Sequence, residues 1–129
     1  METPAQVVRD FVDRFVAAWP TGDAATVAAL FRDDAEYHNG PLDPVHGRAA
    51  IQAAVSGFMA MGGSVSVDIV NLLADEHIVM TERIDHFTID DCTISLPIMG
   101  IFEIQAGRIA AWRDYFDVNQ FTSMLTTNA

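Results

Sequence analysis

The sequence predicts an α+β fold in which helices come first and a meander of long strands follows. Through residue 60, apolar residues recur at helical spacing, whereas from residue 64 onward they alternate with polar residues at a period of two. Pairs of turn-forming residues separate the alternating segments, which favours consecutive antiparallel hairpins. We therefore expect a strongly curved, mixed but mainly antiparallel sheet, wrapped over three N-terminal helices as a cone that encloses a deep apolar pocket.

The three helices are predicted from their start and stop signals. Thr3 can cap the first helix, Pro4 suits its first turn, and Gln6 completes a capping-box pattern. The motif PTGD ends this helix, and Asp23 can cap a second one over AATVAALF. The third helix is expected over roughly Arg48–Ala60, with two glycines after its end.

Four long strands and one short strand are expected. The long strands are predicted in the segments SVSVDIVNLLA, HIVMTERIDHFTI, TISLPIMGIFEI and RIAAWRDYF. A short strand is expected around Ala35–Tyr37, in an otherwise irregular segment, and it is expected to pair with the edge of the sheet. Asp117 can cap a short closing helix that runs through Met124.

Length and charge limit the class of protein. A chain of 129 residues is most simply one domain, over residues 1–129, and is long enough for a hydrophobic core. Seven basic against 18 acidic residues give a net charge of -11, a field that repels phosphate backbones and argues against nucleic-acid binding. No basic amphipathic stretch, membrane span or signal peptide is visible, so a soluble cytoplasmic protein that does not bind membranes is expected.

Cysteine and histidine give no sign of a metal site. Cys92 is the one cysteine, which excludes an intrachain disulfide and leaves cysteine-rich metal motifs without ligands. The four histidines show no metal-ligand spacing.

Three ionisable side chains are expected on the inner face of the sheet. Trp112 and Asp114 share one face of the last strand, and the aromatic ring identifies it as the core face. By the same alternation, Phe87 draws Arg83 and Asp85 inward. The strand between them places Leu96, Ile98, Gly100 and Phe102 on one face, with almost no polarity. This mixture predicts an apolar pocket that contains a few polar groups.

Two carboxylates that share one guanidinium suggest acid–base chemistry. Arg83 stabilises an ionised aspartate, whereas a second carboxylate nearby resists joint ionisation, so Asp85 and Asp114 can hold one proton between them. A structural ion-pair network explains the same spacing equally well. Tyr37 and Asn39 share a side of an extended segment and add two polar groups near a pocket mouth, although ordinary turn chemistry also accounts for the asparagine.

The motifs YHNGPLDPVHGR, TERIDHF, MGIFEI and GRIAAWRDYFD resemble, in order and spacing, those of the limonene-1,2-epoxide hydrolase family. The resemblance covers most of the chain from Tyr37 onward. The preceding helices fit the same cone-shaped fold, which is also that of nuclear transport factor 2, ketosteroid isomerase and SnoaL-like proteins. Gly40 departs from the family pattern, where an apolar residue is expected, and this predicts a wider or looser entrance to the pocket.

The resemblance implies a one-step conversion of an epoxide to a vicinal diol without a covalent enzyme intermediate. In this implied reaction Asp114 takes a proton from a water that Tyr37 and Asn39 hold, while protonated Asp85 donates to the epoxide oxygen and Arg83 bridges both carboxylates. The implied partners are a small apolar epoxide, cyclic or terpene-like, and water, and neither a metal nor a cofactor is required. The expected pocket walls are Trp112, Leu96, Ile98, Phe102 and Phe87.

Two other functions stay open from the sequence. An isomerase of the ketosteroid type or a polyketide cyclase also needs a carboxylate beside an acid, but neither explains an arginine between the two aspartates. A non-catalytic small-molecule-binding module on the same fold is the other alternative, because one fold hosts many functions. A homodimer is expected through the outer face of the sheet, which carries a mixed patch of Glu82, Ile84, His86, Met99 and Ile101.

Overall fold

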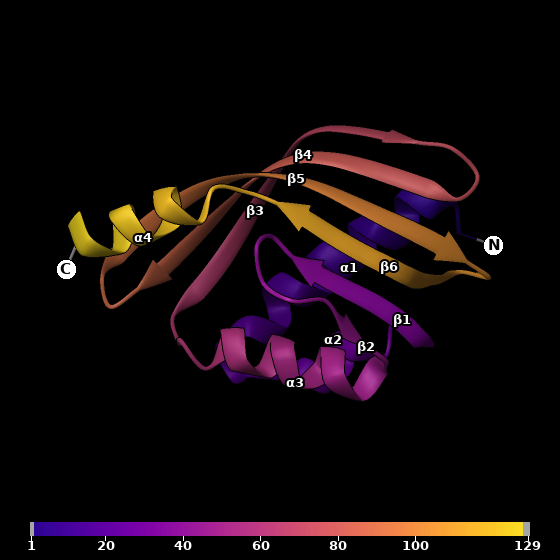
Figure 1. Ribbon diagram of the computed structural model, residues 1–129, viewed down its shortest axis with the longest axis horizontal. Helices are drawn as coiled ribbons and strands as arrows, with labels where there is room; N and C mark the ends of the chain where they lie inside the picture. The colour runs from indigo at the N-terminus through magenta and orange to yellow at the C-terminus, as the bar shows by residue number, and fades with distance from the viewer. Residues whose placement is uncertain (1, 128–129) are drawn as a thin grey trace.

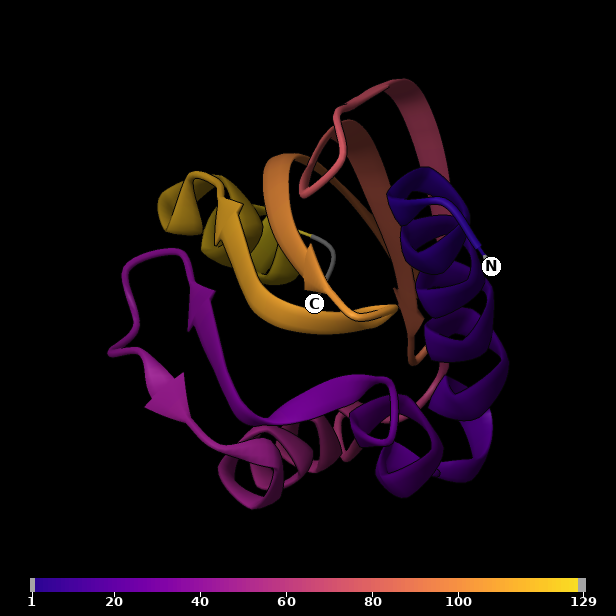
Figure 2. The ribbon, with the colours of Figure 1, turned by 90° about the vertical axis from the view of Figure 1, so that its right-hand side faces the viewer.

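A computed structural model describes residues 2–127, which form a curved six-stranded sheet with helices packed against it (Figure 1). Figure 2 shows the curl of the sheet, with α1 beside β3 and α3 beneath β1. The elements, in chain order, are α1 (Pro4–Ala18), the 3-10 helix η1 (Trp19–Thr21), α2 (Ala24–Ala28), β1 (Phe31–Asn39), β2 (Val45–His46), α3 (Arg48–Met59), β3 (Ser64–Ala74), β4 (Ile78–Ile89), β5 (Cys92–Gln105), β6 (Arg108–Tyr115) and α4 (Val118–Thr127).

The helix signals of the sequence act in the structure as expected. Thr3 Oγ1 accepts a hydrogen bond from the Gln6 backbone N–H at 3.2 Å, and Gln6 Oε1 accepts one from the Thr3 N–H at 2.7 Å. This capping box satisfies two of the free N–H groups at the start of α1. Asp23 caps α2 through the N–H of Thr26, and Asp117 accepts from the first N–H groups of α4 in the same way.

The strands β3 to β6 are joined by tight antiparallel hairpins, and the order across the whole sheet is β2-β1-β6-β5-β4-β3. Asp90 and Asp91, between β4 and β5, both have positive φ, as do Ala106 and Gly107 between β5 and β6. Two residues at positive φ form the type of turn whose twist matches that of paired strands. The four long strands predicted from the sequence are confirmed, and so is the α+β fold class, with a sheet that does not close.

The structure corrects the sequence-based expectation for the segment before the third helix. The second helix does not reach Phe31, because α2 ends at Ala28 and Phe31 pairs with Ile109 of β6 as the first residue of β1. Burying this phenylalanine in the sheet outweighs the local helical pattern. The short strand expected around Ala35–Tyr37 is therefore a nine-residue strand.

As expected, this first strand pairs with the edge of the meander formed by β3 to β6, and it also has a neighbour on its other side. It runs parallel to β6, and the two-residue strand β2 pairs with it on its other side. At the C-terminus, α4 continues past Met124 to Thr127.

The inner face of the sheet packs against α1, α2 and α3 around a core of aliphatic and aromatic side chains. The Phe11 ring of α1 contacts the rings of Phe15, Phe31, Phe102 and Trp112, at centroid distances of 5.0 to 5.9 Å. Helix and sheet thereby share one hydrophobic cluster. In this cluster, the orientation of Trp112 confirms which face of β6 points inward.

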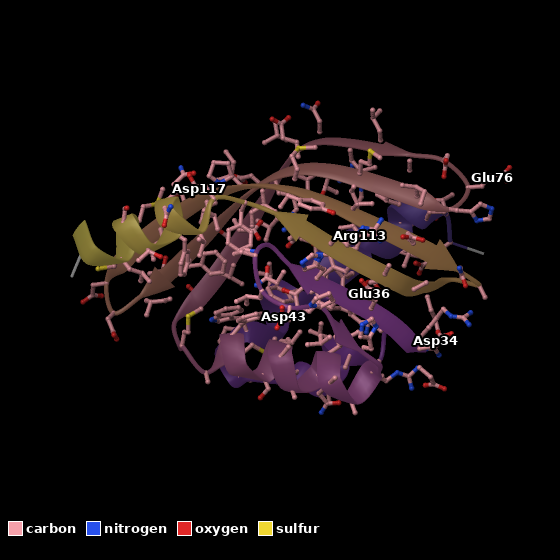
Figure 3. The ribbon with its side chains drawn as sticks, in the orientation of Figure 1. Asp34, Glu36, Asp43, Glu76, Arg113 and Asp117 are labelled. Carbon is pink, nitrogen blue, oxygen red and sulfur yellow. The ribbon has the colours of Figure 1, made fainter. Side chains whose placement is uncertain are left out.

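The acidic side chains are distributed over the surface, whereas few polar groups are buried. Figure 3 shows Asp34, Glu36, Asp43, Glu76 and Asp117 spread from one end of the molecule to the other. Within the described residues, no helix is long and apolar enough to cross a membrane.

Candidate active site

An apolar cavity of about 240 Å³ lies between the inner face of the sheet, α1 and α4. Most of its lining side chains are aromatic or aliphatic. The polar and ionisable lining residues are Tyr37, Asn39, Arg83, Asp85 and Asp114, the five side chains that the sequence nominated as catalytic. Such a cavity, apolar with a few convergent polar groups, is the usual form of a site for a small molecule.

Besides Tyr37, four polar or charged residues are buried among residues 2–125, whose exposure the structure describes, and all four lie in one cluster. They are Thr81, Arg83, Asp85 and Asp114. Thr81 pairs with Gly100 of β5, and Gly100 in turn pairs with Asp114 of β6, so these residues form a row across three strands. Arg83 and Asp85 follow Thr81 on the same face of β4 because side chains alternate along a strand.

Arg83 bridges the two aspartates with bidentate hydrogen bonds. Its Nη1 and Nη2 donate to the two oxygens of Asp114 at 3.0 and 2.9 Å. Its Nε and Nη2 donate to the two oxygens of Asp85, both at 3.1 Å. The remaining Nη1 hydrogen points to Thr81 Oγ1 at 3.3 Å. All five N–H donors of the guanidinium therefore have protein acceptors, and none is left for a ligand.

Gly100 and Thr81 make room for this ion-pair network. A Cβ atom at position 100 would overlap Arg83 Nη1 and would lie 2.5 Å from Asp114 Oδ1. The Thr81 hydroxyl, which is fully buried, donates to the Gly100 carbonyl at 3.2 Å while it accepts from Arg83. The sequence analysis gave neither residue a role in the site. A glycine among otherwise bulky side chains on the inner face of β5 was the available sequence signal for Gly100.

Trp112 orients the Asp114 carboxylate. Its indole Nε1 donates to Asp114 Oδ1 at 2.9 Å, and the same oxygen accepts from Arg83 Nη1. Oδ1 thus has two donors, whereas Oδ2 has a single donor from Arg83 and keeps one lone pair. This asymmetry leaves Oδ2 as the atom of Asp114 that can accept a further proton.

Tyr37 and Asn39 reach the site because β1 runs parallel beside β6. In that register Tyr37 pairs with Trp112 and Asn39 with Asp114. The Tyr37 ring stacks on the Trp112 indole, with centroids 4.1 Å apart and an interplanar angle of 14°. Both side chains line the cavity next to Asp114.

Burial sets the protonation states of two of these groups. Burial raises the pKa of Asp85 above its ordinary value, because the carboxylate loses its hydration, and Arg83 only partly opposes this effect. Burial and the charge of Asp114 likewise hold the pKa of Tyr37 well above its usual value. Burial by itself would lower the pKa of Arg83, but the two aspartates raise it above its ordinary value. Arg83 is thus a cation, Tyr37 is neutral, and Asp85 retains a proton more readily than an exposed aspartate.

The apolar walls include the five side chains expected from the sequence: Phe87, Leu96, Ile98, Phe102 and Trp112. The sequence analysis missed that α4 also covers the cavity, through Val118 and Phe121. Phe121 packs edge-on against Phe87, with ring centroids 5.9 Å apart. The sequence predicted the helix, but nothing local to it indicated where it would dock.

Gly40 does not leave the open space that the sequence suggested at the entrance. Its φ of +55° places it in the left-handed region, and the ring of Phe116 occupies the space where a side chain would begin.

No group of three or more His, Cys, Asp or Glu side chains within residues 2–127 is arranged to hold a metal ion.

Comparison with known proteins identifies the family. The limonene-1,2-epoxide hydrolase catalytic domain model matches residues 3–127. Epoxide hydrolase EphG of Mycobacterium tuberculosis is 34% identical to this chain over 107 residues, which are 83% of this chain and 71% of that protein. A solved structure of an LEH-like epoxide hydrolase from M. tuberculosis superimposes with a TM-score of 0.74 at 30% identity, over 96% of this chain and 92% of that one.

A protein from Catenulispora acidiphila with a ketosteroid isomerase-like fold, solved in complex with trimethylamine, superimposes with a TM-score of 0.77. Its identity is 20%, over 95% of this chain and 93% of that one, so this likeness shows the fold alone. The other matches go further, because the family model spans residues 3–127 and the mycobacterial matches cover 83% and 96% of this chain at 34% and 30% identity. The chain therefore belongs to the limonene-1,2-epoxide hydrolase family.

Proposed function

We propose that this chain hydrolyses a small apolar epoxide to a vicinal diol in one step, by attack of water with general acid and base assistance and without a covalent intermediate. The observation that carries this proposal is the buried cluster in which Arg83 bridges Asp85 and Asp114 at the wall of an apolar cavity. Membership of an epoxide hydrolase family supports the reaction class.

Asp114 is the proposed general base. Its Oδ2 keeps a free lone pair, and Tyr37 and Asn39 lie beside it on the neighbouring strand with groups that can hold a water. As Asp114 takes a proton, the water oxygen forms a bond to one epoxide carbon and the bond between that carbon and the ring oxygen breaks. The electron pair of this bond stays on the ring oxygen.

Asp85 is the proposed general acid that protonates this oxygen. Arg83 offers only N–H donors and cannot accept a hydrogen bond, so the Asp85 proton points away from it. The raised pKa of Asp85 favours the protonated state that donation requires. One proton leaves the water and one reaches the alkoxide, so the sum is epoxide plus water giving diol. Proton exchange with solvent then returns both aspartates to their starting states.

Arg83 has a positioning and electrostatic role in this proposal. Because all five of its donors are bound to protein acceptors, it does not contact the substrate. Its positive charge stabilises the ionised Asp114, and its bidentate hydrogen bonds to both aspartates fix the distance between Asp114 and Asp85. Trp112 performs a similar positioning role through Asp114 Oδ1.

The cavity lining favours apolar epoxides, and a cyclic or terpene-like epoxide is the substrate that we propose. A volume of about 240 Å³ suits a compact molecule, and no cation other than the fully engaged Arg83 lines the cavity within residues 2–127. Charged epoxides would lose their hydration on entry without gaining a partner.

The test is diol formation from cyclic and terpene epoxides in ¹⁸O-labelled water, with wild type beside Asp114→Asn. Under single-turnover conditions the proposal requires ¹⁸O in the diol, because a carboxylate ester intermediate would instead transfer an enzyme oxygen. Asp114→Asn is expected to lose about 10²–10⁴-fold in rate, the usual contribution of a general base. The matched control Asp10→Asn removes an exposed carboxylate on α1 and should retain full activity. Full hydrolysis by Asp114→Asn would show that another group is the base.

We also propose that two copies of the chain associate through the outer face of the sheet. The apolar residues Met80, Met99 and Tyr115 are half-exposed there, at 46%, 50% and 50%. Met99 pairs with Tyr115 and Met80 with Ile101, so these side chains form one continuous patch across β4, β5 and β6. A self-complementary apolar patch is typical of a two-fold symmetric homodimer.

Sedimentation equilibrium tests this association. Wild type is expected to sediment as a dimer, and Met99→Asp as a monomer, because the charge would be buried unpaired at the interface. Leu125→Asp, at an exposed leucine of α4 rather than of the sheet, is the control and should remain dimeric. A monomeric wild type at micromolar concentration would contradict the proposal.

A further inference from the structure

Gly40 and Phe116 are packed against each other at one side of the cavity. A Cβ atom added to Gly40 would lie 2.7, 3.0 and 3.2 Å from the Cε1, Cζ and Cδ1 atoms of the Phe116 ring. Carbon atoms at optimal contact are about 3.5–4.0 Å apart. The Phe116 ring therefore occupies its present position because residue 40 has no side chain.

Gly40 is itself fastened to the strand that carries the proposed base. Its backbone N–H donates to the Asp114 carbonyl at 2.7 Å, and its φ of +55° turns the chain away from β1 into the following loop. Phe116 follows Asp114 by two residues, just past the end of β6. The glycine and the ring are thus held at the same end of β6 as Asp114.

Phe116 lines the same cavity as the buried carboxylates of Asp85 and Asp114. Leu42 and Val118 line the same cavity and are 54% and 42% exposed, whereas Asp114 is buried. The half-buried Phe116 ring lies in the chain between Asp114 and Val118. Phe116 is thus a cavity-lining ring two residues from the proposed base, where it can contact a group attached to the reacting epoxide carbon.

We propose that Phe116, seated against Gly40, is a specificity-determining residue that limits the size of the apolar substituent on the reacting epoxide. This inference rests on the proposed function. Gly40 acts through the ring: a side chain at position 40 pushes the ring away from the loop and toward the cavity, which reduces the space for the substrate. Removing the ring has the opposite effect and opens the cavity beside Asp114.

The experiment measures kcat/KM for cyclohexene oxide and for its bulkier relative 1-phenylcyclohexene oxide, and takes the ratio of bulky to small. Phe116→Ala is expected to raise this ratio by about tenfold, within the range by which apolar pockets discriminate small differences in substrate size. Gly40→Ala is expected to lower the ratio. In a double-mutant cycle, Gly40→Ala should leave the ratio unchanged once Phe116→Ala is present, because there is no ring to displace.

Gly107→Ala is the control for backbone strain. Gly107 also has a positive φ, +76°, but a Cβ there would meet nothing within 4 Å, and it lies in the hairpin before β6 rather than after it. Its substitution carries the strain of a left-handed residue without a displaced ring. Gly107→Ala should lower thermal stability while leaving the substrate ratio unchanged.

Phe116→Leu, which keeps more of the buried volume, replaces Phe116→Ala if the latter does not fold.

Four results decide between the possibilities. An unchanged ratio in a folded Phe116 variant would overturn the proposal, and so would an effect of Gly40→Ala that is the same with and without the ring. If wild type hydrolyses neither epoxide, the proposed function fails for these substrates. Binding of the two corresponding diols, followed by tryptophan fluorescence, then measures the same ratio in wild type and variants. A binding ratio that Phe116→Ala leaves unchanged would overturn the specificity role independently of catalysis.

Discussion

At the scale of single residues, the site depends on charges that are buried together and fully hydrogen-bonded. Removing an ion from water costs several kcal/mol, and an attraction to one partner seldom offsets that cost. Arg83 meets the requirement with five donors on Asp85, Asp114 and Thr81. Within the described residues, no buried side-chain nitrogen or oxygen lacks a partner.

Gly100 provides a test of how tightly this network is packed. Gly100→Ala would place a methyl group on Arg83 Nη1 and against Asp114 Oδ1. Overpacking a rigid site costs about 1–3 kcal/mol, and displacing a reacting carboxylate by about 1 Å can reduce the rate ~100-fold. We expect a lower melting temperature and a much lower kcat for epoxide hydrolysis. Gly57→Ala, at a helical glycine where a Cβ meets nothing within 4 Å, should not lower kcat. Unchanged kinetics in Gly100→Ala would mean that the network tolerates rearrangement.

The raised pKa of Asp85 predicts a pH dependence of both activity and stability. The proposed reaction requires protonated Asp85, so kcat/KM should fall as pH rises through the folded-state pKa, which lies above the ordinary value of about 3.9. Between these two pKa values the folded state binds more protons than the unfolded state. The free energy of unfolding therefore decreases as pH rises through this window.

Denaturant unfolding of wild type and Asp85→Asn across the same pH range measures this contribution. The variant lacks the titrating group, so its stability should change less with pH than that of wild type in this window. The exposed-site variant Asp10→Asn should follow the wild-type curve. Parallel curves for wild type and Asp85→Asn would contradict a raised pKa at Asp85.

At the scale of elements, local signals predicted most of the helices and hairpins but not their docking. The four long strands were predictable because alternation and turn residues are properties of neighbouring residues. The length of β1 was not, because Phe31 belongs to the strand only through its pairing with Ile109. The position of α4 over the cavity depends in the same way on contacts with distant strands, such as that between Phe121 and Phe87.

Helix α4 is expected to contribute to substrate binding rather than to chemistry. Phe121→Ala removes a ring that lines the cavity and packs on Phe87. We expect KM for apolar epoxides to rise several-fold while kcat changes little. Phe121 makes no hydrogen bond or ion pair with the ionisable cluster among the described residues. Steady-state kinetics measure this split, and Asn119→Ala, on the exposed surface of the same helix, is the control. A loss confined to kcat would instead place Phe121 near the reacting atoms.

At the scale of the whole molecule, one aromatic cluster supports both the fold and the cavity. Phe11 of α1 is 2% exposed, contacts rings from β1, β5 and β6, and also lines the cavity. The helix thus holds the curved sheet and closes one side of the site. The membership of the epoxide hydrolase family and the α+β fold are confirmed, whereas the single domain over residues 1–129, the cytoplasmic location and the homodimer stay predictions.

Substitution of Phe11 measures how far stability and site share this cluster. Phe11→Ala is expected to reduce the free energy of unfolding by about 3–5 kcal/mol, the usual cost of truncating a buried phenylalanine. Phe11→Leu, which retains most of the volume, should cost less than half of that. Chemical denaturation gives both values. A small loss in Phe11→Ala would mean that the cavity wall collapses into the space without strain.

The sequence by itself determined which residues form the long strands, which side chains share a face, and hence that Arg83, Asp85 and Asp114 point inward. These are consequences of alternation and turn chemistry, which act between near neighbours in the chain. The tertiary structure decided that β1 runs parallel beside β6, which brings Tyr37 onto Trp112 and Asn39 next to Asp114. It also decided that Gly100 and Thr81 accommodate the guanidinium and that Phe116 fills the space beside Gly40. These features depend on contacts between segments far apart in the chain, and packing of the whole core selects them.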